Sequence, residues 1–194
     1  MTQDTSGVTA RFDGGNEVRA DVLVGCDGLR SIVRESVHGA TAPPFAGYIA
    51  YRALVPMERI RGIVIEPPSC LQIGPRHSFT RYPVRNGELL NYVAMAEKSG
   101  WEVESWSVRA DVPEVLEEFR DFEPDVRRII AETPADTCFK WALLDREPLA
   151  SWARERVTLL GDAAHPMLPF LGQGAVMAIE DAMVLARAFA ASGD

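Results

Sequence analysis

The stretch from residue 157 to residue 174 constrains the fold more than any other part of the chain. Val157, Leu159 and Leu160 predict a short buried strand, which Gly161 ends. Asp162 then stands at the carboxyl end of that strand. Open α/β sheets bind their ligands outside these ends, and a carboxylate there can accept hydrogen bonds from both hydroxyls of a ribose. The stretch therefore predicts an α/β unit with a ligand site at this turn.

A helix is predicted to begin at Gly174. Apolar residues recur there at helical spacing, namely Ala175, Ile179, Ala182, Ala186 and Phe189, while Glu180, Asp181 and Arg187 fall elsewhere. The first N–H groups of a helix favour negative charge, and Gly172 and Gly174 keep side chains away from them. The alternative is a plain loop with Asp162 as a helix cap. The combined run of Gly-Asp, His-Pro and Gly-Gln-Gly favours a ligand site.

The segment from Val157 to Leu185 resembles the second flavin-binding motif of the FAD-dependent aromatic hydroxylases, the group that contains salicylate and 3-hydroxybenzoate hydroxylases. Residues 20–34 (ADVLVGCDGLRSIVR) resemble the Asp-Gly motif of the same family, which lies near both flavin and pyridine nucleotide. Residues 82–91 and 141–146 are also similar. The resemblance covers nearly the whole chain. It departs from the family pattern at Arg81, where many members carry His before the Tyr-Pro pair.

This resemblance implies an α/β fold. A partial FAD/NAD(P)-binding, Rossmann-like domain is interrupted by a mainly antiparallel β-sheet substrate domain with helices. Residues 1–45 would form the first part of the FAD-binding domain, with the Asp-Gly motif. Residues 46–147 would form the substrate-binding domain. Residues 148–194 would complete the FAD-binding domain with the Gly-Asp motif and its helix.

The resemblance also implies an FAD-dependent monooxygenase that hydroxylates an aromatic, phenolic-acid-like substrate with NAD(P)H and oxygen. FAD and NAD(P)H are the expected cofactors, and a small aromatic molecule is the expected partner. The alternative is a catalytically inactive fragment that keeps the substrate-domain fold and acts, if at all, by self-association or partner binding. A flavin dehydrogenase or halogenase on the same scaffold is a further reading, although the Trp and Lys signatures of halogenases are not apparent.

A complete member would carry a strand, a Gly-x-Gly-x-x-Gly turn and a helix. The only near match here, at residues 172–177, ends in Met177, where close helix packing needs Gly or Ala. We therefore expect an N-terminally truncated chain. The strands at residues 22–26 and 157–160 would lack a neighbour, so an exposed edge or apolar patch is expected to promote homo-oligomers.

Several site residues follow from the resemblance. The cofactor-binding residues are expected to be Gly161, Asp162, Gly172, Gln173, Gly174, Ala175, Asp27 and Arg34. The main chain at Pro169 is expected beside the reactive edge of the flavin, while His165 is expected to hold the loop. Asp27 has a second reading as the cap of a helix at Ser31. Arg34 and Arg30 lie one helical turn apart, and either face a pyrophosphate or form a solvated face.

His77 is the candidate catalytic residue together with Pro169. A histidine beside the strand that leads to Tyr82 can hydrogen-bond a phenolic substrate or act as its base. The alternative is a turn histidine at the surface. Trp101, Trp106 and Trp141 are expected to serve packing, and one of them is a candidate wall for an aromatic ring.

Composition and residue spacing argue against several other classes of protein. The net charge of −8 argues against nucleic-acid binding. No apolar run approaches the roughly 20 residues that span a bilayer, and the polar N-terminus has no signal-peptide pattern, so a cytoplasmic location without membrane contact is expected. The three histidines lack metal-ligand spacing, so no metal is expected. Cys26, Cys70 and Cys138 are expected to be buried thiols.

Other elements follow from periodicity and turn residues. A hairpin is predicted over residues 7–18 and a helix over residues 30–37. Strands are predicted at residues 22–26, 47–54, 62–65, 70–73, 78–82, 89–96 and 137–144. Two helices are predicted after Pro113, separated by Glu123 and Pro124.

Overall fold

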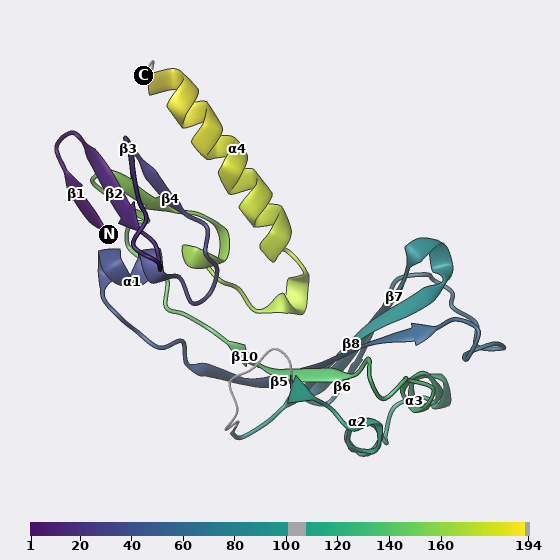
Figure 1. Cartoon of the computed structure of the whole chain (residues 1–194). Helices are drawn as coiled ribbons and strands as arrows, with labels where there is room; N and C mark the ends of the chain where they lie inside the picture. Colours follow the sequence, from purple (N-terminus) through teal and green to yellow (C-terminus); the bar gives the residue numbers. More distant parts are fainter. Residues whose placement is uncertain (101–107, 193–194) are drawn as a thin grey trace. The chain divides into compact units, whose positions relative to one another are not determined.

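The computed structural model describes residues 1–100 and 108–192 (Figure 1). Trp101 and Trp106, predicted as packing residues, lie outside the described residues. The chain divides into two compact units: unit one contains residues 1–44 and 144–194, and unit two contains residues 45–143. The fold is mixed α/β with antiparallel sheets, which confirms the predicted class.

Unit one begins with a three-stranded antiparallel sheet of β1 (Thr2–Asp4), β2 (Gly7–Arg11) and β3 (Glu17–Ala20). The predicted hairpin is confirmed, with Val8 opposite Ala20 and Arg11 opposite Glu17. Strand β1 was not predicted, and it pairs with β2 through a tight turn. The Asp4 carboxylate stabilises that turn, because it accepts hydrogen bonds from the Ser6 and Gly7 N–H groups.

A second sheet of unit one contains β4 (Leu23–Gly25), β11 (Ala153–Arg154) and β12 (Val157–Leu159), in the order β11-β12-β4. Strands β4 and β12 are parallel, so residues far apart in the sequence lie side by side. Helix α1 (Ile32–His38) packs on β4 at Gly25, where a Cβ atom would lie 2.8 Å from the Cβ of Val33. The unit continues with two 3-10 turns, η2 (Gly161–Ala163) and η3 (Pro169–Leu171), and with helix α4 (Gly174–Ser192).

Unit two is built on one six-stranded sheet, in the order β6-β7-β8-β5-β10-β9. Its strands are β5 (Phe45–Pro56), β6 (Cys70–Gly74), β7 (His77–Val84), β8 (Leu89–Glu97), β9 (Val108–Arg109) and β10 (Phe139–Leu144), with a 3-10 turn η1 (Arg85–Gly87) between β7 and β8. Helices α2 (Val112–Glu118) and α3 (Pro124–Ala131) lie on the same side of this sheet (Figure 1). Both predicted helices after Pro113 are therefore confirmed.

The pairing register divides the six-stranded sheet into two faces. Tyr51, Ala94 and Phe79 are directly opposite one another on β5, β8 and β7, and they join the buried core with helix residues such as Phe119. Because neighbouring residues of a strand point to opposite faces, Arg52 and Asn91 belong to the helix-free face. Phe139 and Trp141 belong there too, since Lys140 between them pairs with Glu114 of α2.

Two sequence predictions are wrong. Residues 62–65 form no strand, although Ile63 and Ile65 pack against the core while Val64 is exposed. Burial alternates along this segment as it does in a strand. The segment nevertheless follows a turn and pairs with no described strand. Cys26 is exposed and Cys70 is half-buried, so only Cys138 is the buried thiol expected. Among the described residues, no helix has the length and apolar character needed to cross a membrane.

Candidate functional site

The turn after β12 presents Asp162 at the surface of unit one. Gly161 has a φ of +59°, a left-handed conformation that favours glycine, and a Cβ atom there would lie 3.1 Å from the Cβ of Ala178. The N–H groups of Ala164 and His165 both donate to the Gly161 carbonyl, at 2.9 Å. The Asp162 carboxylate is exposed and makes no hydrogen bond or ion pair with a described residue. It is therefore available to accept hydrogen bonds from a ligand.

Asp181 of α4 holds this turn against the helix through two contacts of one carboxylate oxygen. One oxygen, Oδ2, accepts a hydrogen bond from the Gly161 N–H at 3.0 Å and lies 2.5 Å from His165 Nε2. The His165 ring also packs on Trp152, with ring centroids 4.7 Å apart. Asp181 thus connects both ends of the turn to the helix. The sequence placed Asp181 away from the apolar positions of α4, and in the structure it faces inward beside Ala178.

The start of α4 lies next to the Asp162 carboxylate. A Cβ atom on Gly174 would lie 3.9 Å from Asp162 Oδ1, so the missing side chain leaves room beside the carboxylate. The first helical hydrogen bond runs from the Met177 N–H to the Gln173 carbonyl, which leaves earlier N–H groups free. Gly172, at φ +64°, turns the chain from η3 into the helix. Pro169, Gln173 and Ala175 are exposed along this turn.

The segment of the predicted Asp-Gly motif is tied to the same turn by Arg34. This side chain is only 5% exposed, and its guanidinium donates to the carbonyls of Ala163 and Ala164 at 3.1 and 3.0 Å. It also donates to the Glu147 carbonyl at 3.1 Å. Burial lowers the pKa of Arg34, and the nearby charge of Arg146 adds to this effect. Arg34 therefore positions the turn that carries Asp162.

Ser31 is the N-cap of helix α1, and Asp27 supports this helix start. The Asp27 carboxylate accepts hydrogen bonds from the Ser31 hydroxyl at 2.5 Å and from the Val33 N–H at 3.1 Å. The Ser31 hydroxyl in turn accepts from the Arg34 N–H. These contacts match the capping alternative that the sequence left open.

Sequence reasoning missed the role of Arg146. This buried arginine donates from Nε to the Leu29 carbonyl at 2.8 Å, and from Nη1 to the Thr41 carbonyl and hydroxyl at 2.8 and 2.9 Å. Arg146 thus holds both ends of the α1 segment. The contacts connect residues more than a hundred positions apart, so no local pattern indicates them.

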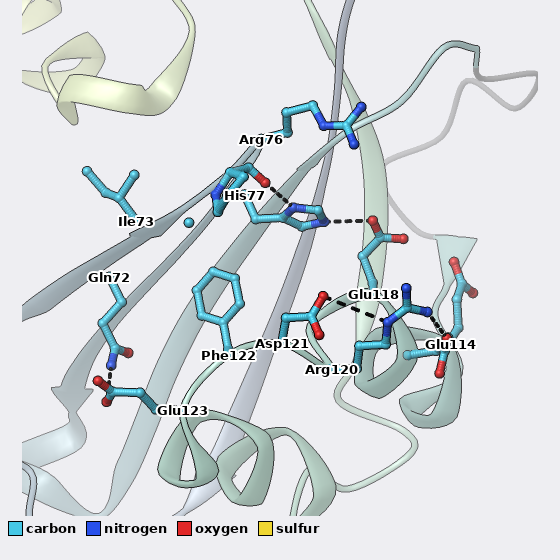
Figure 2. Close-up of a pocket in the computed structure, with 13 residues that line it drawn as sticks. Gln72, Ile73, Arg76, His77, Glu114, Glu118, Arg120, Asp121, Phe122 and Glu123 are labelled. Carbon is cyan, nitrogen blue, oxygen red and sulfur yellow. Dashed lines mark hydrogen bonds and ion pairs between the residues drawn. The ribbon is translucent and has the colours of Figure 1, made fainter.

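His77 lies in unit two, at the start of β7, beside a cavity of about 800 Å³ (Figure 2). Its Nδ1 lies 2.8 Å from the Pro75 carbonyl, and its Nε2 lies 2.8 Å from Glu118 Oε1. Glu118 also pairs with Lys98. Burial raises the pKa of Glu118, but the hydrogen bonds from Lys98 and His77 outweigh it and hold this pKa below its ordinary value. Both ring nitrogens of His77 therefore face acceptor oxygens of the chain itself.

These residues of unit one fit the polar part of FAD. Asp162 offers an acceptor for the hydroxyls of the ribityl chain, and the free N–H groups at the start of α4 offer donors and partial positive charge to the flavin ring. Gly172 and Gly174 leave the backbone accessible.

Comparison with known proteins finds relatives whose names describe a monooxygenase and a hydroxylase of hydroxybenzoates. The 3-amino-4-hydroxybenzoate 2-monooxygenase PtnB3 of Streptomyces platensis is 38% identical over 93% of this chain and 45% of its own length. The 3-hydroxybenzoate 6-hydroxylase of Klebsiella oxytoca is 36% identical over 98% of this chain and 47% of its own length. The chain spans about half the length of the curated relatives it matches.

Solved structures show the same fold. A salicylate hydroxylase in a substrate complex has a TM-score of 0.76 at 30% identity, covering 90% of this chain and 46% of that protein. HpxO of Klebsiella pneumoniae, complexed with FAD and uric acid, has a TM-score of 0.83 at 28% identity, covering 97% of this chain and 47% of that protein. A family model described as an FAD binding domain matches residues 1–193. The chain therefore belongs to this family of FAD binding domains, as the two motifs predicted.

Proposed function

We propose that this chain carries the flavin-ring side of the cofactor site, together with the substrate sheet, of an FAD-dependent aromatic monooxygenase. The observation that carries the proposal is the exposed, unpaired carboxylate of Asp162 beside the start of α4. The relatives support it, because their names describe monooxygenases and hydroxylases of aromatic acids. They favour the enzyme over the alternative of an inactive fragment.

Each proposed cofactor contact has a physical role. Asp162 accepts hydrogen bonds from ribityl hydroxyls, and Gly161 gives the turn its left-handed backbone. The segment from Gly172 through Gln173 and Gly174 to Ala175 presents N–H groups to the flavin ring, where they stabilise negative charge. The main chain at Pro169 borders the ring. Asp27 and Arg34 act by positioning, since their side chains already bond within the chain.

The chemistry that FAD supplies when bound is reduction by a pyridine nucleotide and activation of oxygen. We propose NAD(P)H as the reductant and a small phenolic acid as the substrate. The hydrogen bonds of His77 favour a structural role over that of a substrate base. The cytoplasmic location expected from the sequence stays a prediction.

Titration with FAD tests the proposal. We expect the purified chain to change the visible spectrum of FAD, and Asp162→Asn to weaken binding by about tenfold or more, because hydrogen bonds to a charged acceptor contribute about 1.5–3 kcal/mol each. Asp13→Asn is the matched control, since this exposed carboxylate in the β2–β3 hairpin makes no hydrogen bond or ion pair with a described residue. An unchanged FAD spectrum at saturating cofactor contradicts the proposal.

The outward face of α4 supports a second copy of the chain as a partner. Ile179 is 70% exposed and Val184 is 65% exposed, and none of the described residues of this helix is fully buried. Glu180 and Arg187 lie two helical turns apart on this helix, close to the exposed apolar residues Ile179 and Val184. In an antiparallel pair of α4 helices, Glu180 of each copy would face Arg187 of the other, so we propose an isologous dimer.

Light scattering tests this partner. We expect a dimer at micromolar concentration, dissociation of the dimer by Glu180→Lys, and recovery when Arg187→Glu is added to it. A monodisperse monomer contradicts the dimer but leaves the FAD proposal intact. Aggregation without recovery by the charge swap also contradicts it.

A further inference from the structure

The cavity beside His77 lies in unit two and has a volume of about 800 Å³, within the range of sites that bind small molecules. Strand β6 and the turn after it form one wall, and helix α2 with the turn before α3 forms the other (Figure 2). The cavity is therefore on the helix side of the six-stranded sheet. It contains none of the residues that we propose for the FAD site, so a ligand bound here is distinct from FAD.

Phe122 gives the cavity an apolar wall. A Cβ atom on Gly74 would lie 3.1 Å from two atoms of the Phe122 ring, so the ring lies against β6 where a side chain is missing. Phe119 packs edge-on against the same ring, with ring centroids 5.0 Å apart, and this contact fixes the ring in place. Phe122 is half-buried, which leaves part of its surface accessible from the cavity. An apolar stem of a ligand can pack on this surface.

The carboxylates of the cavity are not equivalent. Four of the five that line it form ion pairs within the chain, namely Glu114 with Lys140, Glu118 with Lys98, and both Glu117 and Asp121 with Arg120. Glu123 is the exception, since the described residues supply it with no cation. It accepts a hydrogen bond from the neutral amide of Gln72, from Nε2 to Oε2 at 3.1 Å. The Oε1 atom of the same amide has no hydrogen-bond donor. This end of the cavity therefore has negative charge that the chain does not compensate.

Arg76 provides the opposite charge at the other end of the cavity (Figure 2). It belongs to the two-residue turn between Gly74 and His77, which pair directly, and its φ of +59° is a left-handed conformation that few residues other than glycine adopt. Arg76 is exposed, and no carboxylate of residues 1–100 or 108–192 forms an ion pair with it. Four positions separate it from Gln72, which is at most about 13 Å along an extended chain. A small molecule can span this separation.

We propose that this cavity binds a small zwitterion with an apolar stem, such as an aliphatic amino acid whose two charges lie at opposite ends. Its ammonium group would lie at Glu123, its stem on Phe122, and its carboxylate at Arg76, whose guanidinium forms a fork that matches a carboxylate. A ligand with one charge leaves either Glu123 or Arg76 unmatched. The site goes beyond the proposed monooxygenase function, because it uses neither the cofactor turn nor an aromatic ring.

Titration of the full chain with 6-aminohexanoate, monitored by amide chemical shifts in NMR, tests this site. Hexylamine and hexanoate are the matched probes, since each keeps the stem and only one of the two charges. We expect the zwitterion to bind about threefold to fivefold more tightly than either probe, because one exposed ion pair contributes up to about fivefold in affinity. The largest shifts are expected at the amides of Gly74, Arg76 and Phe122.

Two variants assign the two ends of the ligand. Arg76→Gln should remove the advantage of 6-aminohexanoate over hexylamine and leave the affinity for hexylamine unchanged. Glu123→Gln should remove its advantage over hexanoate and leave the affinity for hexanoate unchanged. Both side chains are exposed, so neither variant removes packing from the core. Arg59→Gln and Glu58→Gln are the matched controls, since both residues are exposed in unit two and their side chains make no hydrogen bond or ion pair with a described residue.

The proposal is overturned if 6-aminohexanoate binds no more tightly than hexylamine and hexanoate. Variants at Arg76 and Glu123 that keep the advantage of the zwitterion also overturn it, as does an equal loss in the two control variants. Chemical shifts that change only outside β6, the turn after it and the turn before α3 place the ligand elsewhere and reject the cavity.

Discussion

Replacing Asp181 separates the turn of Asp162 from helix α4. Its Oδ2 serves both the Gly161 N–H, at 3.0 Å, and His165 Nε2, at 2.5 Å, and the side chain is only 14% exposed. Asp181→Ala removes both contacts. Hydrogen bonds to a charged group contribute about 1.5–3 kcal/mol each, and two that share one oxygen are not additive, so we expect a loss of about 2–4 kcal/mol. Asp181→Asn keeps an oxygen in place without the charge and should lose less.

Hydrogen exchange at the Gly161 amide measures this loss locally, which matters because a chain of two units does not unfold in one step. The expected loss corresponds to exchange about 30- to 1,000-fold faster in Asp181→Ala. FAD affinity should fall most in Asp181→Ala and less in Asp181→Asn, since Gly161 directly precedes Asp162. Asp13→Asn, in the β2–β3 hairpin of the same unit, is the control. Exchange in Asp181→Ala as slow as in this control would refute the role of Asp181.

Three further predictions concern both units. Gly25→Ala places a Cβ 2.8 Å from Val33 and 2.9 Å from Leu159, so thermal unfolding should show a loss of about 1–3 kcal/mol in unit one. The lowered pKa of Glu118 means that its ionised form stabilises unit two above the ordinary carboxyl pKa of about 4.3, and this stability is lost as the pH falls through the lowered pKa. Urea unfolding should therefore show a difference between Glu118→Gln and the parent chain that is largest near neutral pH and shrinks in acid; a constant difference contradicts this. Burial raises the pKa of the Cys138 thiol, so a thiol reagent at neutral pH should react with Cys138 only after unfolding, as mass spectrometry can check.

The sequence predicts elements well where local signals agree. Residues 7–18 alternate on both sides of a Gly-Gly turn, and the hairpin forms. Residues 62–65 contain three β-branched apolar residues, yet a strand requires a partner, and the turn that precedes this segment leaves it without one. Strand β1 has only three residues, which is too short for any period to be visible.

The candidate site shows the same division between local and distant information. Gly161, Asp162 and Gly174 are recognisable because the strand, the turn and the helix start are continuous in sequence. Asp181 is separated from Gly161 by 20 positions, and the helical periodicity that sets it apart from the apolar positions does not indicate this contact. Such a contact becomes predictable only when the packing of the helix on the turn is known.

The positioning of this turn relies on charged side chains because the surroundings provide little apolar packing. The buried apolar clusters of unit one are small, and Leu159, Ala163 and Ala164 form the one nearest to Asp162. Irregular turns leave backbone carbonyls and N–H groups without partners in a sheet, and these groups must be paired when they are buried. Arg34 supplies donors to two of these carbonyls, and Asp181 supplies an acceptor to the Gly161 N–H. A related chain with an intact Gly-Asp motif but without these two side chains would therefore present Asp162 on an unsupported turn, so Arg34 and Asp181 together are a stricter criterion for a working site than the motif alone.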